Sequence, residues 1–151
     1  MTIDIKKKLH QACRDSLLKR EAAIREALRE AQESANEETK SSAGDKHETG
    51  RAMMQLETEK LSGQLREVLQ EQEKLQQINP DKKCHIVEPG ALVITDTLRL
   101  YFSISAGKLL IDGVEYFALS AQTPLGQLAL GKQEGGTFAF QQRTYRVISV
   151  I

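Results

Sequence analysis

The feature that most constrains the fold of this chain is a single interruption in a long helical pattern. Between residues 3 and 78 there is no proline, and most positions outside the apolar ones are Lys, Arg, Glu or Gln, which are good helix formers. The pattern breaks once, at Ser41-Ser42-Ala43-Gly44-Asp45. We therefore predict two long helices, 3–40 and 46–78, that are joined by a turn.

Apolar residues recur along both predicted helices at the spacing of a narrow packing seam, which predicts a two-stranded coiled coil. The short turn makes the pair antiparallel and intramolecular. An ordinary amphipathic helix of a globular bundle is the alternative, but the sequence offers no third long helix to pack with. The predicted seam residues are Ile5, Leu9, Cys13, Leu17, Ile24, Leu28, Ala31 and Ala35 in the first helix, and Met54, Thr58, Leu61, Leu65, Val68, Gln72 and Leu75 in the second.

The second half of the chain changes to the alternating pattern of β-strands after the helix stop at Asn79-Pro80. Asp112-Gly113 between apolar runs predicts a tight hairpin, and Gln141-Gln142-Arg143 predicts the turn of the last one. A short helix is expected at 123–130, where proline is tolerated in the first turn. The strands are expected at 91–95, 98–104, 108–111, 114–120, 137–140 and 144–151.

These patterns predict an α+β fold. An N-terminal antiparallel two-helix coiled coil over residues 1–80 is followed by a small, mostly antiparallel β-domain with one short helix over 81–151. All aromatic residues follow residue 100, so the helical half lacks the large side chains of a thick core.

Composition excludes several classes of function. The formal net charge of the 151 residues is zero, which gives no strong electrostatic footprint for nucleic acid. The two cysteines form neither a disulfide framework nor a zinc site, and no nucleotide-binding glycine loop occurs. No signal peptide or apolar run of membrane-spanning length is found. We expect a cytoplasmic monomer that does not bind membranes.

The turn between the helices, near residues 41–50, is acidic. Asp45 and Glu48 are three residues apart at the start of the second helix, so their carboxylates can lie near one point. Carboxylates there contribute nothing to core packing. Helix capping is the structural explanation for these two residues, because acidic side chains favour a helix N-terminus.

Two stretches resemble the bacterial Gre transcript cleavage factors. Gly44-Asp45-Lys46-His47-Glu48 matches the Gly-Asp-x-x-Glu at the tip of their coiled coil. Residues 120–132, SAQTPLGQLALGK, then Glu134-Gly135 and a last hairpin, resemble their C-terminal domain. As architecture the resemblance covers nearly the whole chain, and in sequence it is specific over 119–136.

The resemblance implies a transcription elongation factor that acts on RNA polymerase and is not an enzyme by itself. Its FKBP-like C-terminal domain would dock on the rim of the polymerase secondary channel, while the coiled coil enters the channel towards the RNA 3′ end. Asp45 and Glu48 would help hold the second Mg²⁺ of the polymerase and its water, so that backtracked RNA is cleaved. The partner-binding residues implied are Ser120, Thr123, Pro124, Leu125, Gly126, Leu128 and Lys132.

Three residues after the tip motif depart from the family pattern. Thr49, Arg51 and Ala52 stand where the family has Asn, an acidic residue and an aromatic one. Arg51 could contact RNA phosphate or pair with Glu48. The alternatives are a regulator that binds the channel without promoting cleavage, and an unrelated coiled-coil adaptor. Residues 123–126 could also serve only to start a helix.

Overall fold

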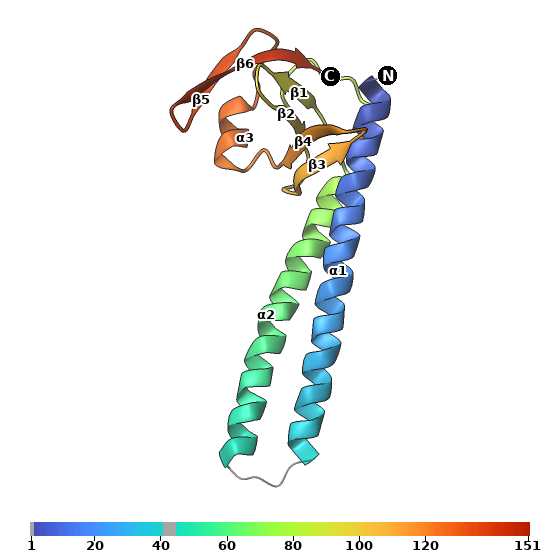
Figure 1. The fold of residues 1–151 in the computed structure, drawn as a ribbon, viewed down its shortest axis with the longest axis vertical. Coiled ribbons are helices and arrows are strands. Elements are labelled where there is room, and N and C mark those ends of the chain that lie inside the picture. The colour runs from blue at the N-terminus through green and yellow to red at the C-terminus, as the bar shows by residue number, and fades with distance from the viewer. Residues whose placement is uncertain (1, 41–44) are drawn as a thin grey trace. The chain divides into compact units, whose positions relative to one another are not determined.

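The structure, a computed structural model, describes residues 2–40 and 45–151, with side chains described over 4–37 and 49–151. Two long helices, α1 (Thr2–Lys40) and α2 (Asp45–Gln76), precede a six-stranded sheet and one short helix (Figure 1). The predicted α+β class is therefore confirmed. The turn residues 41–44 lie outside the described residues.

The six strands closely follow the predicted ranges, and the sheet order is β3-β4-β2-β1-β6-β5. Only β2 and β4 pair in parallel among the strands described, so the sheet is mostly antiparallel, as predicted. Whether this domain is FKBP-like stays a prediction. The strands are β1 (Leu92–Thr95), β2 (Arg99–Phe102), β3 (Gly107–Ile111), β4 (Val114–Leu119), β5 (Thr137–Phe140) and β6 (Arg143–Val150), and the short helix α3 spans Pro124–Ala129.

Two hairpin turns use backbone conformations in the left-handed region. Asp112 and Gly113 between β3 and β4 have φ of 51° and 79°, which confirms the predicted turn. Gln141 and Gln142 between β5 and β6 have φ of 52° and 66°. Two consecutive glutamines there are unfavourable, because a Cβ crowds the following carbonyl oxygen in this conformation.

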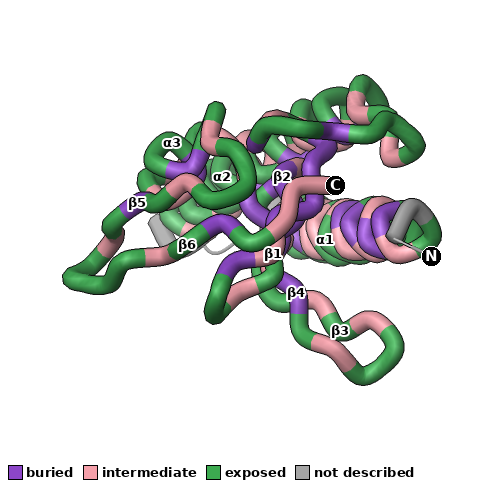
Figure 2. Tube along the Cα trace, turned by 90° about the horizontal axis from the view of Figure 1, so that it is seen from above, coloured by how far each residue is buried: buried purple, intermediate pink, exposed green. Residues whose placement is uncertain are grey.

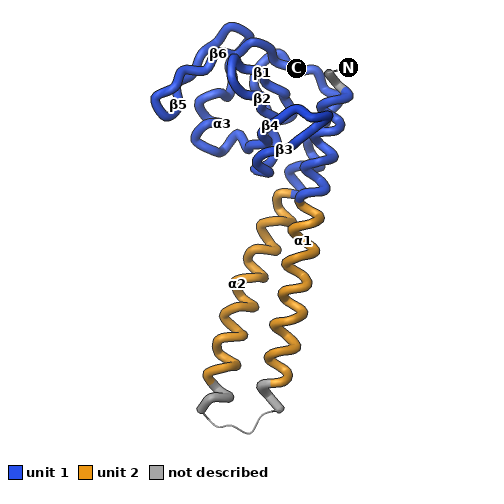
Figure 3. The backbone as a smooth tube through the Cα atoms, viewed as in Figure 1, with its two compact units in different colours: residues 1–16, 72–151 blue, residues 17–71 orange. Residues whose placement is uncertain are grey.

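The chain divides into two compact units, shown in Figure 3. The first unit contains Met1–Ser16 and Gln72–Ile151, and the second contains Leu17–Glu71. The first turns of α1 therefore belong to the same compact unit as the sheet. The domain ranges 1–80 and 81–151, which follow the change of secondary structure, stay a prediction.

The core of the first unit uses both faces of the sheet. One face contributes Val93, Leu100 and Phe102 to a buried cluster that also includes Ala129 of α3. Neighbouring strand residues point to opposite faces, so Tyr101 faces the other way. There its hydroxyl is 3.0 Å from His10 Nδ1 of α1. Figure 2 shows buried residues along the inner strands and along the first part of α1.

Within α1, residues of the predicted seam therefore have two different partners. The Cys13 sulfur lies 3.5 Å from the Ser103 hydroxyl oxygen, so this residue packs on the sheet. Leu17, Leu61 and Val68 in the second unit are buried, as expected of seam positions between helices. No predicted seam residue is exposed.

Candidate functional site

The predicted acidic turn, near residues 41–50, lies largely outside the residues whose side chains the structure describes. α2 begins at Asp45, which agrees with the predicted helix start near this residue. The side chains of Asp45, His47 and Glu48 lie outside the described residues. Their capping and metal-binding roles therefore both stay predictions, as does the pairing of Arg51 with Glu48.

The helical segments that lead to the turn have a groove between them. It is lined from α1 by Gln32, Ala35 and Asn36, and from α2 by Arg51, Met54, Gln55 and Thr58. The lining is mostly amide and small side chains, so the seam is less apolar here than at Leu61 and Val68. Thr49, Arg51 and Ala52, the residues that depart from the family pattern, are all exposed. They are accessible to a partner that reaches this part of the helices.

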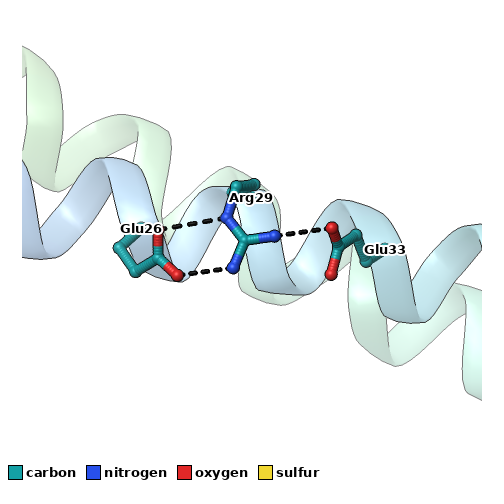
Figure 4. A network of polar contacts seen from close by, with 3 residues as sticks. All are labelled: Glu26, Arg29 and Glu33. Atoms are coloured by element: carbon teal, nitrogen blue, oxygen red, sulfur yellow. Dashed lines mark hydrogen bonds and ion pairs between the residues drawn. The ribbon is translucent and has the colours of Figure 1, made fainter.

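Two acidic residues of α1, Glu26 and Glu33, form ion pairs within the helix. Arg29 contacts Glu26 and Glu33, three residues before it and four after it, at 2.5 Å in each pair (Figure 4). The Arg29 hydrogen bond holds the pKa of the exposed Glu26 carboxyl below its usual value. Such i,i+3 and i,i+4 pairs stabilise a surface helix modestly. The carboxylate of Glu33 is thus accounted for by α1 itself.

The second predicted site, at residues 120–132, is built around the start of α3. Thr123 caps the helix: its hydroxyl oxygen accepts from the Gly126 amide at 3.1 Å and donates to the Ser120 carbonyl at 2.8 Å. The Ser120 hydroxyl in turn accepts from the Gln122 amide at 3.1 Å. Pro124 occupies the first helical position, where its missing N–H costs nothing. Helix initiation therefore accounts for Ser120, Thr123 and Pro124.

Gly126 is buried and has a packing role. A Cβ built on it would lie 2.9 Å from Thr123 Oγ1, 3.0 Å from Ala121 Cα, and closer still to the Ser120 carbonyl oxygen. Leu125 packs against the buried core cluster. Gly126 and Leu125, both predicted to bind a partner, therefore have packing roles at α3.

The outer side of α3 presents apolar side chains to solvent. Pro124 is exposed, and the side chains of Leu128 and Leu130 are 43% and 45% exposed. The segment around Ile86, itself 37% exposed, runs beside the end of α3, since Val87 and Gly131–Lys132 exchange backbone hydrogen bonds of 2.8 and 2.9 Å. We name Ile86, Pro124, Leu128 and Leu130 the α3 patch. Sequence reasoning missed Ile86 and Leu130, because apolar residues in a strand-rich domain are expected inside.

Two kinds of site are absent from the part of the chain that the structure describes. No group of three or more His, Cys, Asp and Glu residues in it could hold a metal ion. None of its helices combines the length and the apolar character needed to span a bilayer.

Comparison with known proteins gives distant structural neighbours. No family model matches the chain, and neither does any curated protein. Among solved structures, the crystal structure of GreA factor homolog 1 (Gfh1) of Thermus thermophilus is 18% identical; the alignment covers 91% of this chain and 93% of that one, with a TM-score of 0.37. A second structure of the transcription factor Gfh1 is 18% identical over 90% and 91%, with a TM-score of 0.36.

Proposed function

We propose that this protein is a Gre-like factor that binds RNA polymerase and acts through the polymerase secondary channel. The observation that carries the proposal is the position of the Gly44-Asp45-x-x-Glu48 motif. Its first acid is the first residue of α2, and residues of the predicted seam such as Leu17 of α1 and Leu61 and Val68 of α2 are buried. The Thr123-Pro124-Leu125-Gly126 motif independently begins a short helix in the β-domain, as the resemblance requires.

The two carboxylates would act on a metal that belongs to the polymerase. Mg²⁺ prefers oxygen ligands and keeps several waters, so an incoming carboxylate can complete a loosely held site. Asp45 would contact the ion, and Glu48 would orient or deprotonate the attacking water. The protein would then be an accessory factor, with cleavage of backtracked RNA performed in the polymerase active site.

The α3 patch is suited to the docking step. Single exposed apolar residues are normal, but the four of the α3 patch lie on α3, directly after it and on the segment beside its end, and together they offer apolar surface to a protein partner. Within it Leu128 can be made charged without touching the core, because it lies on the outer side of α3. A Leu128→Asp variant should lose binding to core polymerase in a pull-down. Leu110→Asp is the matched control, since Leu110 is 66% exposed on β3 and should still bind.

The pull-down also separates the proposal from its alternatives. A coiled-coil adaptor for some other protein would fail to retain core polymerase at all. A channel regulator without cleavage activity would bind, compete with a cleavage factor and inhibit RNA synthesis. Arg51 favours keeping this second candidate, because it is an exposed cation in the groove near the turn, where the family has an acidic residue. The production of short 3′ RNA fragments from a backtracked complex decides between these two candidates.

A further inference from the structure

Lys6 is completely buried, which is rare for a lysine. Its ammonium nitrogen donates to the carbonyl oxygens of Lys82 at 2.6 Å and of Ile151 at 3.0 Å. Its third contact is the sulfur of Cys84 at 4.0 Å. All four residues belong to the first compact unit, so α1 and the segment after α2 hold an amine and a thiol side by side, although 78 positions separate them in sequence.

The surroundings favour Lys6 as a nucleophile, whereas Cys84 depends on local opening of its segment to react. Burial lowers the pKa of Lys6, which increases the share of the neutral, nucleophilic amine. Burial also raises the pKa of the Cys84 thiol, which favours the protonated thiol over the thiolate while the segment is closed. Cys84 is 3% exposed, but Lys83 and His85 on either side of it are exposed, and the segment 81–85 belongs to no helix or strand. Local opening of such a segment admits a molecule as small as hydrogen peroxide.

We propose that peroxide converts Lys6 and Cys84 into a covalent sulfenamide crosslink. In the first step the Cys84 sulfur attacks peroxide, the O–O bond breaks, and a sulfenic acid and one water form. In the second step the Lys6 nitrogen attacks this sulfur, the S–O bond breaks, and a second water leaves. Sulfur is oxidised by two electrons, peroxide is reduced, and the product is an S–N bond between the two side chains.

Proximity is the reason to expect the second step. When the segment closes again, the sulfenic acid at Cys84 lies next to the Lys6 amine, which the carbonyls of Lys82 and Ile151 hold in place, so formation of the S–N bond is intramolecular. A thiol reductant reopens the S–N bond and restores both side chains. The crosslink closes a long loop and should raise the melting temperature of the protein.

The test is mass spectrometry of the full chain after peroxide treatment, in a Cys13→Ser background that prevents an internal disulfide. The intact mass should fall by two hydrogens, peptide mapping should recover Lys6 joined to Cys84, and dithiothreitol should reverse both changes. Lys6→Arg should abolish the crosslink. Lys7→Arg, the matched control at an exposed neighbouring position, should preserve it.

Three results would overturn the proposal. They are oxygen addition at Cys84 without a linked peptide, an unmodified chain after prolonged treatment, and a crosslink that persists in Lys6→Arg. Should Lys6→Arg fail to fold, peptide mapping of the Cys13→Ser protein with an intact Lys6 still decides the question. Polymerase binding is not needed for any of these readouts, so they are independent of the proposed function.

Discussion

Gly126 allows the sharpest test of how the α3 region is built. Alanine forms helices better than glycine by about 0.5–1 kcal/mol, so helix propensity alone predicts that Gly126→Ala is stabilising. The added methyl group, however, would press on the Ser120 carbonyl oxygen. That oxygen cannot easily move, because it accepts hydrogen bonds from the Thr123 amide and hydroxyl at 3.1 and 2.8 Å. Overpacking against backbone costs roughly 1–3 kcal/mol, and we expect a net loss of about 1–2 kcal/mol.

Gly63 in α2 provides the matched control. A Cβ built there has nothing within 4 Å, so Gly63→Ala should gain about 0.5–1 kcal/mol from propensity. Urea unfolding measures both variants. All aromatic residues follow residue 100, so near-UV circular dichroism reports the unit that contains Gly126, while the signal at 222 nm is weighted towards the long helices. A Gly126→Ala protein as stable as the parent would refute the claim that Ser120 and Thr123 leave no room for a methyl group.

Three further predictions concern stability. Gln142→Gly should raise the free energy of unfolding by about 1 kcal/mol, since glycine relieves the left-handed strain; urea unfolding checks this. Leu17→Ala should lower the free energy of unfolding by about 2–4 kcal/mol, because Leu17 is fully buried. Leu18→Ala, at a position that is 52% exposed, should lower it by less than about 1 kcal/mol. Equal losses in the two variants would contradict the assignment of Leu17 to the seam. Burial lowers the pKa of His10, so the unfolded chain binds this proton more tightly than the folded one. Stability should therefore fall as pH drops below about 6.5, and this dependence should be weaker in His10→Gln, as thermal melts across pH 5–8 would show.

Much of the fold follows from local sequence signals. The break at 41–45, the stop at Asn79-Pro80 and the Asp112-Gly113 turn each act through backbone conformation within a few residues. For that reason the helix and strand bounds lie within two residues of the predicted ones at most ends. The capping role of Thr123 is equally local, and the sequence predicts it, because helix initiation by residues 123–126 is the alternative to the docking hypothesis.

The features that sequence reasoning missed depend on contacts between distant segments. Cys13 fits the helix seam by spacing, but it lies against Ser103 because the first turns of α1 pack on the sheet. By sequence Lys6 is one of several charged residues of a helix, but in the structure its amine donates to the carbonyl oxygens of Lys82 and Ile151, which are far away in the chain. The parallel pairing of β2 with β4 depends on the path of the chain between them, which alternation of side chains does not encode.

The most direct test of the proposed function is cleavage of RNA by a stalled, backtracked bacterial RNA polymerase in the presence of Mg²⁺. The protein should release short 3′ RNA fragments, and Asp45→Ala and Glu48→Ala should each abolish this stimulation while retaining polymerase binding. Glu37→Ala, which removes an exposed acid of α1 outside the motif, should remain active. If no fragments form with the wild-type protein, and Asp45→Ala changes no transcription assay, the proposed role of these two carboxylates is wrong.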